Sequence, residues 1–245
     1  MNKLSVTAFL AMGLIAAGAA RADENVLTPF HADYSLQRNS LGLGTSSFSL
    51  GRDGDGYLYK SAAHASGLAS LFSSSTITQE SRFTLVDGRP RPASYRYEDS
   101  GKSQDAETIR FDWDKRNATT EENGQQKAKP LTPNTSDVQL IQLMLASDVA
   151  AGRAEDGYRL LDHGQITAYT AKPLPDAPLK AAGKTYSTKV VQLNNAERGR
   201  TITVWLAPEL HYLPVQIQQA QTGKATITLT LQKATFDAGS LSAGN

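Results

Sequence analysis

The chain of 245 residues contains no cysteine. This absence excludes thiol catalysis, iron–sulfur clusters, cysteine-ligated zinc and disulfide bonds, so stability has to come from packing and backbone hydrogen bonds. A large excess of either charge is also missing, because 25 basic residues face 24 acidic ones and the net charge is +1. A nearly neutral chain has no electrostatic basis for binding nucleic acid.

Motifs with catalytic or metal-binding spacing are missing as well. No Gly-x-Ser-x-Gly turn marks a hydrolase nucleophile, and none of the four histidines lies two, three or four positions from another. The run Asp53–Gly56 lacks the further oxygen ligands and the closing Glu of a calcium-binding loop, so it predicts a hairpin turn. The residues therefore predict a protein that is not an enzyme and that holds no metal or other cofactor.

The first 22 residues have the pattern of a secretory signal peptide. One cation, Lys3, precedes an uncharged run from Leu4 to Ala20, and Ala20-Arg21-Ala22 forms a small-x-small cleavage site. The alternative, a membrane anchor, is disfavoured because the run is rich in Ala and Gly and slightly short for a span. We expect cleavage after Ala22, a periplasmic protein and no transmembrane span in the product.

Most of the remaining chain alternates apolar and polar residues with the period of two that is typical of half-buried strands. Ile109, Phe111 and Trp113 show this alternation on one face. Tight-turn pairs separate such runs, namely Asp87-Gly88, Asn123-Gly124 and His163-Gly164. The spacing of the turns predicts roughly a dozen antiparallel strands. The proline-rich stretch Lys172–Pro178 is expected to be an exposed connection or a bent edge.

One segment, Ser136–Ala151, breaks this alternation and predicts a helix. Ser136 and Gln139 have the spacing of a capping box, and Asp137 favours a helix N-terminus. Gly152 follows as a C-terminal stop. The apolar face repeats at helical spacing along Val138, Ile141, Leu145 and Val149. An apolar face of this size needs a cover, so we expect the helix to pack against the concave side of a curved sheet.

Together these elements predict an all-β fold with one main helix. We expect a large, curved antiparallel sheet or open β-barrel, of the β-spiral or half-barrel kind, wrapped on the central helix. No repeat and no clear linker divides the chain. Residues 1–22 are therefore assigned to the signal peptide, residues 23–236 to a single domain and residues 237–245 to a flexible tail.

Several stretches, in a consistent order, resemble the DUF3108 family of exported bacterial proteins of unknown function. These stretches are Leu43-Gly44, Phe48-Ser49-Leu50, Gly67–Phe72, Ser81-Arg82-Phe83, Arg91–Tyr97, Phe111-Asp112-Trp113, Asp137–Leu145 and Trp205–Val215. The resemblance covers nearly all of the chain after the signal peptide. It implies a β-rich periplasmic fold akin to open β-spiral or half-barrel envelope proteins, and it implies no set of catalytic residues.

The export signal, the single apolar helix and the lack of a catalytic motif favour a non-enzymatic role in maintaining the cell envelope. The protein would bind a lipid or another amphiphile, or an envelope protein. A ligand pocket is expected between the helix and the concave face. Its expected contacts are Trp205, Val138, Ile141 and Leu145. Two alternatives stay open, namely a scaffold protein whose barrel is filled and, less favoured, a hydrolase acting on envelope glycans or lipids.

Overall fold

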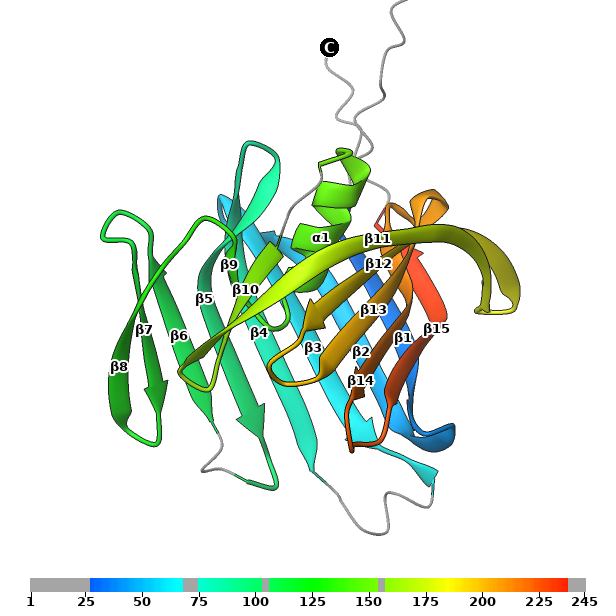
Figure 1. Ribbon diagram of the computed structural model, residues 1–245, viewed down its shortest axis with the longest axis horizontal. Coiled ribbons are helices and arrows are strands. Elements are labelled where there is room, and N and C mark those ends of the chain that lie inside the picture. The colour runs from blue at the N-terminus through cyan, green and yellow to red at the C-terminus, as the bar shows by residue number, and fades with distance from the viewer. Residues whose placement is uncertain (1–26, 68–74, 103–105, 154–156, 238–245) are drawn as a thin grey trace, which may run out of the picture.

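The computed structural model describes residues 27–67, 75–102, 106–153 and 157–237. The predicted signal peptide, residues 1–22, and residues 238–245 of the predicted tail lie outside these ranges. The described residues form one sheet of fifteen strands together with one α-helix, α1 (Figure 1). The fold is therefore mostly β with a single helix, as the alternating pattern and the apolar segment predict.

The first half of the chain is a meander of eight strands. They are β1 (Phe30–Arg38), β2 (Leu41–Asp53), β3 (Gly56–Ala65), β4 (Thr76–Val86), β5 (Arg89–Asp99), β6 (Glu107–Asp112), β7 (Asn117–Glu122) and β8 (Gln125–Pro130). The second half contains the helix and the remaining strands. These are β9 (Thr135–Asp137), α1 (Ile141–Ala150), β10 (Gly157–Asp162), β11 (Gln165–Ala181), β12 (Lys184–Asn195), β13 (Arg200–Ala207), the 3-10 turn η3 (Pro208–Leu210), β14 (Leu213–Gln221) and β15 (Ile227–Phe236).

The chain enters the sheet at its middle. From β1 the strands add outward one after another to β8, which forms one edge of the sheet. The chain then crosses to the other edge, β9, and the remaining strands return until β15 pairs with β1. Neighbouring strands are antiparallel except β9 and β10, which are parallel.

Left-handed residues at the tight turns explain the hairpins. The two φ values are 53° and 72° in the Asp87-Gly88 turn and 52° and 71° in the Asn123-Gly124 turn. In the His163-Gly164 turn they are 45° and 64°. Two consecutive positive φ values are typical of the type I′ turn, whose twist matches the twist of paired strands. The three predicted hairpins are therefore confirmed.

The sheet curls around α1 so that its two ends overlap. α1 lies inside the curve, and the long strand β11 crosses in front of it (Figure 1). Where the ends overlap, the Ser81 hydroxyl of β4 donates a hydrogen bond of 2.8 Å to Asp137 of β9. The β10–β11 hairpin reaches β6, where the Gly164 N–H lies 3.0 Å from a carboxylate oxygen of Glu107. This open, overlapping curve confirms the predicted fold class.

Two clusters of buried apolar side chains fill the fold. The larger lies between α1 and the concave face, with Leu140, Met144 and Leu206 fully buried in it. The smaller lies where β10 passes over β5–β7 and consists of Tyr95, Ile109, Phe111, Ala118, Leu131 and Leu161. Trp113 packs against this smaller cluster, and its Nε1–H donates to the Pro92 carbonyl at 2.7 Å. Trp113 is therefore part of the packing of the molecule.

The helix begins later than predicted. Thr135–Asp137 pair with β10 as a short parallel strand, and α1 starts only at Ile141. The predicted capping box is wrong because Ser136 belongs to this strand, and its hydroxyl has no hydrogen-bond partner among the described residues. Gln139 instead contacts the neighbouring strand β3. The predicted C-terminal stop is confirmed, since Gly152 follows the helix with a φ of 63°.

The proline-rich stretch Lys172–Pro178 lies within a strand. It belongs to β11, so the predicted connection is wrong and the alternative of a bent edge describes it. β10 pairs with β11 only as far as Thr170, which leaves the rest of β11 with one neighbour. The register against β12 shifts between Leu174 and Ala177. Proline has no N–H to donate, so an edge with an irregular register is where a strand tolerates it.

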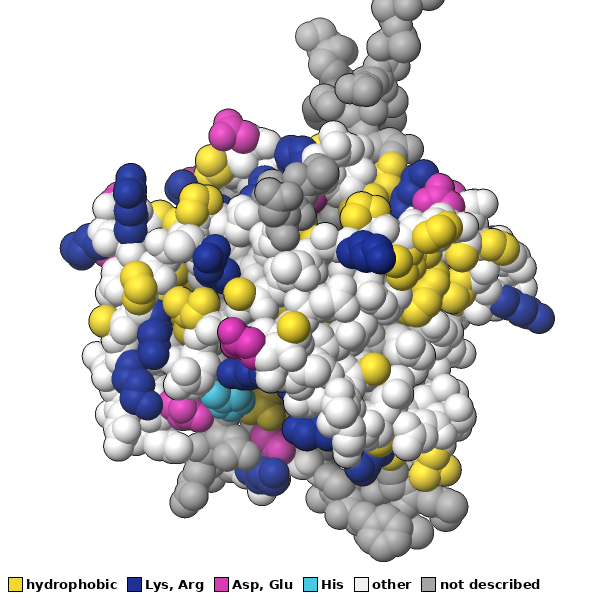
Figure 2. Space-filling view, in the orientation of Figure 1, with side chains coloured by type: hydrophobic (Ala, Val, Ile, Leu, Met, Phe, Trp, Pro, Cys, Tyr) yellow, Lys and Arg dark blue, Asp and Glu magenta, His cyan; other side chains and the backbone are white. Residues whose placement is uncertain are grey.

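No helix in the described part of the chain has the length and hydrophobicity of a membrane span. On the face that β11 crosses, Lys, Arg, Asp and Glu side chains are dispersed among neutral ones (Figure 2). This mixture of both signs agrees with the small net charge of the chain.

Candidate functional site

One buried carboxylate fixes the segment that precedes α1. Asp137, at the end of β9, is fully buried, and its Oδ1 accepts backbone N–H bonds from Gln139 at 3.0 Å and Leu140 at 2.7 Å. The same oxygen accepts the Ser81 hydroxyl at 2.8 Å. An acidic side chain satisfies free N–H groups at a helix entrance in this way. The start of the helical segment is therefore tied to β4.

Burial dominates the titration of this carboxyl group. Removal from water raises the pKa of Asp137 to about 6, although the hydrogen bonds from Leu140, Ser81 and Gln139 act to lower it. The second oxygen, Oδ2, is buried and has no hydrogen-bond partner among the described residues. Because the charged form is disfavoured here, the stability of the helix entrance depends on pH.

Two glutamines extend these contacts to β3. The Gln139 side chain donates from Nε2 to the Tyr59 carbonyl at 3.0 Å and accepts the Ser61 hydroxyl on Oε1 at 3.4 Å. The Tyr59 hydroxyl donates to Gln142 Oε1 at 3.2 Å. We refer to the contacts of Asp137, Gln139 and Gln142 with β3 and β4 as the pinned side of the helix.

A second buried carboxylate holds the other end of α1. Asp148 is 1% exposed. Its Oδ2 accepts Arg89 Nη2 at 2.7 Å and the Tyr158 hydroxyl at 2.8 Å, and its Oδ1 accepts Arg153 Nε at 3.0 Å. Buried polar networks of this kind fix the elements that they join. Buried hydrogen bonds therefore join both ends of the segment that contains α1 to the surrounding strands.

An apolar cavity of about 210 Å³ lies between α1 and the strands β10–β15. Its apolar lining residues are Val138, Ile141, Leu145, Leu160, Tyr169, Leu193, Ile202, Val204, Ile217, Ile227 and Leu229. We call this part of the interior the cavity side of the helix. Concave sites with mainly apolar walls are the usual places where proteins bind small molecules.

The cavity brings together most of the residues that were predicted to contact a ligand. Three of the four line it, namely Val138, Ile141 and Leu145. Trp205 does not line it. Trp205 is half-buried and packs against the larger apolar cluster without being part of the cavity lining. That any of these residues binds a ligand stays a prediction.

Three polar side chains also line the cavity, and they were not predicted from the sequence. They are Gln142, Arg200 and Gln219. Arg200 is the first residue of β13, and its Nε is buried without a hydrogen-bond partner among the described residues. Arg200, Ile202 and Val204 occupy alternate positions of one strand, so the period of two was the signal that could have placed Arg200 in this row. A buried guanidinium nitrogen without a partner is energetically costly and attracts an anion.

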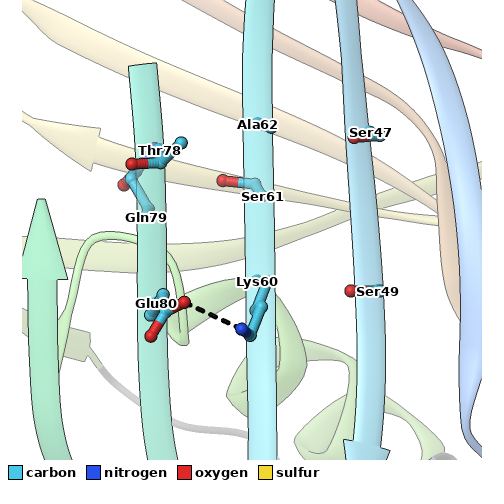
Figure 3. A pocket seen from close by; sticks show the side chains of 8 residues that line it. All are labelled: Ser47, Ser49, Lys60, Ser61, Ala62, Thr78, Gln79 and Glu80. Carbon is cyan, nitrogen blue, oxygen red and sulfur yellow. Dashed lines mark ion pairs between the residues drawn. The ribbon is translucent and has the colours of Figure 1, made fainter. Parts of the chain in front are cut away.

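A second hollow, of about 240 Å³, crosses β2, β3 and β4. Figure 3 shows the side chains that line it, which are Ser47, Ser49, Lys60, Ser61, Ala62, Thr78, Gln79 and Glu80. Lys60 Nζ and Glu80 Oε1 form an ion pair of 2.9 Å, so the cation and the anion of this hollow neutralise each other. The hollow therefore offers neither an apolar wall nor an unpaired charge, and we place the candidate site in the apolar cavity.

Comparison with solved structures identifies the fold. The chain is similar to a β-barrel-like protein of the domain of unknown function DUF1849 from Brucella abortus, with a TM-score of 0.58 and 12% identity over 86% of this chain and 98% of that chain. Similarity is weaker to the Pseudomonas aeruginosa MucA/MucB complex, with a TM-score of 0.38 and 12% identity over 88% of this chain and 54% of that chain. It is also weaker to a Bacteroides fragilis protein with a YmcC-like fold, with a TM-score of 0.30 and 7% identity over 85% and 94% of the two chains. The first similarity shows a shared fold alone.

Comparison by sequence identifies a family. Residues 32–232 match the model of a family described as "Protein of unknown function (DUF3108)". This match runs from β1 into β15, so it includes α1 and all strands that line the cavity. No curated protein matches the chain.

Proposed function

The chain belongs to the DUF3108 family, and we propose that this member is a non-enzymatic periplasmic protein that binds an anionic amphiphile in the cavity beside α1. One observation carries the proposal, namely an apolar cavity that contains a buried guanidinium nitrogen without a partner among the described residues. The signal-like pattern of residues 1–22 supports the compartment.

The walls of the cavity suit a hydrocarbon tail. Most of the lining side chains are aliphatic, contributed by α1 and by the strands from β10 to β15. Burying a hydrocarbon chain against them is favourable by about 0.8 kcal/mol for each CH₂ group. The volume of about 210 Å³ is smaller than the roughly 300–1,000 Å³ of pockets for drug-sized ligands. The proposed ligand therefore has one acyl chain and not the two chains of a bilayer phospholipid.

Arg200 selects the head group of the ligand. A guanidinium group recognises carboxylate and phosphate groups through charge-assisted hydrogen bonds, often two at once. Gln219, on the neighbouring strand β14, adds an amide to the same lining. An acidic head at Arg200 would supply the partner that Nε lacks. These polar residues define how the ligand would lie in the cavity, with its head group at Arg200 and its tail along Ile202 and Val204.

The lining also favours binding over catalysis. The lining residues that the structure describes include no carboxylate, histidine or serine. Hydrolysis without a metal needs a nucleophile or an activated water and a base within hydrogen-bond reach of it. For this reason the proposal places no reaction in the cavity.

Native mass spectrometry of the protein purified from the periplasm tests the proposal directly. We expect an additional mass that survives gentle desolvation and is released by denaturation, with the composition of a single-chain acidic amphiphile. In addition, octanoate, whose short chain suits a cavity of about 210 Å³, should bind the delipidated protein more tightly than 1-octanol, which has the same tail without the charge. A protein that carries no additional mass and binds neither compound would refute the proposal and favour a protein partner.

Matched variants separate the contribution of the ligand's head group to binding from the contribution of its tail. Arg200→Gln should weaken octanoate binding by about tenfold or more, because a hydrogen bond to a charged group contributes about 1.5–3 kcal/mol, and it should leave the binding of 1-octanol unaffected. Leu229→Trp should fill the cavity and weaken both compounds. Thr228→Trp is the control, because Thr228 precedes Leu229 in β15 and its side chain lies on the other face of the strand.

A further inference from the structure

A cluster of acidic side chains surrounds one histidine where the two ends of the sheet overlap, away from the cavity beside α1. The β10–β11 hairpin ends in the His163-Gly164 turn and reaches β6 and β7. Glu107 begins β6 and Glu122 ends β7, and these two residues are directly paired in the sheet. Asp162, the last residue of β10, completes the cluster. Residues from three segments that are distant in sequence therefore meet at one point.

The carboxylates of this cluster lack a matching positive charge. Glu107 and Glu122 are like charges directly opposite each other on antiparallel strands, which is an unfavourable arrangement. No Lys or Arg of the described chain forms an ion pair with Glu107, Glu122 or Asp162, and their one ionic partner is His163. A single imidazole, charged only when protonated, cannot balance three carboxylates at neutral pH.

Glu107 adds an independent sign of an absent partner. Its side chain is 1% exposed, and its Oε1 accepts the Gly164 N–H at 3.0 Å. Its Oε2 is buried and has no hydrogen-bond partner among the described residues. A buried carboxylate oxygen without a partner is rare, because losing hydration without compensation is costly. One oxygen each of Glu107 and Asp162 and one ring nitrogen of His163 lie within 4.8 Å of one another.

The orientation of His163 fits a metal ligand. Its Nδ1 lies 2.9 Å from Glu122 Oε1, so in the neutral ring Nδ1–H donates to this carboxylate and Nε2 keeps its lone pair. Nε2 lies 3.8 Å from Asp162 Oδ1. Atoms that share an ion at distances of about 2.0–2.2 Å lie at most roughly 4.4 Å apart, so this pair is already at bridging distance. A carboxylate on the far nitrogen is the usual orienting partner of a metal-bound imidazole.

We propose that Glu107, Asp162 and His163 bind one divalent transition-metal ion, with Glu122 orienting the imidazole. One nitrogen and two carboxylate oxygens form a mixed donor set of the kind that Zn²⁺ and Mn²⁺ accept. The ion would join β6 to the turn of the β10–β11 hairpin and so fasten the overlap of the sheet. Glu122 is a positioning residue, because it acts on the ion through His163. The histidine spacing in the sequence predicts no such site, since its ligands come from separate strands.

Isothermal titration calorimetry with Zn²⁺ tests this site. The sample is the untagged protein after EDTA treatment and dialysis. We expect one Zn²⁺ per chain and a melting temperature that rises with added Zn²⁺. Glu107→Gln keeps the size of the side chain and an acceptor for Gly164, and it should weaken Zn²⁺ binding by about 100-fold. His163→Gln should act similarly. Glu122→Gln should weaken binding by about 10- to 100-fold, as expected of a residue that orients a ligand.

A surface pair provides the matched control. His31 Nε2 lies 3.2 Å from Asp33 Oδ1 at an exposed position, so His31→Gln removes a comparable His–Asp pair outside the proposed site. This variant should bind Zn²⁺ like the wild type. Co²⁺ gives a second readout, because its absorption bands should appear in the wild type and vanish in His163→Gln. Substoichiometric binding, or unchanged binding by both Glu107→Gln and His163→Gln, would overturn the proposal.

Discussion

The two sides of the interior differ in what joins them to α1. On the pinned side, buried hydrogen bonds connect Asp137 and Gln139 to β4 and β3, and a partly buried one connects Gln142 to β3. On the cavity side, apolar residues of β10–β15 face the same helix across about 210 Å³ of space. Hydrogen bonds require fixed distances and angles, whereas apolar packing requires only close contact. The cavity therefore persists because the helix cannot move to fill it without leaving buried polar groups unpaired.

Removing Asp148 should have the largest effect, because this residue holds the helix end that the pinned side does not reach. Asp148→Ala removes the buried carboxylate that accepts hydrogen bonds from Arg89 Nη2, the Tyr158 hydroxyl and Arg153 Nε. We expect a loss of about 4 kcal/mol in the free energy of unfolding, measured with urea. Asp176→Ala is the control, because Asp176 pairs with Lys189 at the exposed surface, and it should leave stability unchanged. Equal effects of the two variants would show that α1 is not held in this way.

The stability that the pinned side contributes should depend on pH, because Asp137 titrates there. Its folded-state pKa, raised to about 6 from 3.8 by burial, means that the folded protein holds this proton more tightly than the unfolded chain does. The contribution of Asp137 is therefore most favourable below its ordinary pKa and is lost as the pH rises through 6. Between pH 4 and pH 7 we expect the wild type to lose about 2 kcal/mol more than Asp137→Asn, which cannot titrate. Parallel unfolding curves for the two proteins would contradict this expectation.

Two buried leucines of α1 allow a comparison between a closely packed position and a position in the cavity wall. Leu143 and Leu145 are both 2% exposed, but Leu145 lines the cavity and Leu143 does not. Leu143 borders a hollow of only about 10 Å³, so Leu143→Ala creates nearly all of its void anew and should cost about 3 kcal/mol, whereas Leu145→Ala enlarges the large cavity and should cost about 2 kcal/mol. Thermal and urea unfolding measure both values. If the proposed ligand site is correct, only Leu145→Ala should also change the affinity for octanoate, and the reverse pattern would argue against the site.

Gln142 lies at the boundary between the two sides and should give the smallest effect. It accepts the Tyr59 hydroxyl on the pinned side and also lines the cavity. Gln142→Leu leaves that hydroxyl without its acceptor and should lower stability by about 1 kcal/mol. Combining it with Tyr59→Phe should recover most of this loss, because both partners are then apolar. Strictly additive losses in the double mutant would show that this hydrogen bond contributes nothing.

The elements that could be predicted from the sequence are those with a local signal. Alternation and Asx-Gly turns indicated the hairpins, and helical spacing indicated that Val138, Ile141 and Leu145 share a face. The same alternation separates Trp205 from the row of Ile202, yet its size made it a candidate contact. Arg200 continues the row of Ile202, but a charged residue is not expected among core residues, so the sequence does not indicate a place for it in the cavity.

The remaining features depend on contacts that are distant in sequence. Strand β9 has only three residues. Because it pairs with β10, Ser136 and Asp137 lie in a strand and not in the predicted helix. Glu107 and His163 meet only because the sheet curls until its ends overlap. No periodicity within a segment reports such a meeting, because it follows from the curvature of the whole sheet.

The pairing of β1 with β15 has a consequence for the order of folding. Phe30 pairs with Phe236, and the Asp237 N–H donates to the Pro29 carbonyl at 3.0 Å, so the first and last strands join the two halves of the sheet. Contacts between such distant segments form slowly because a long loop must close first. Ile227 and Leu229 of the cavity wall belong to this last strand. A chain synthesised from its N-terminus therefore completes the cavity only after its last strand has been made and has paired. A circular permutant that joins residue 237 to residue 29 and opens at Asn123-Gly124 would make this closure local and should assemble the cavity earlier.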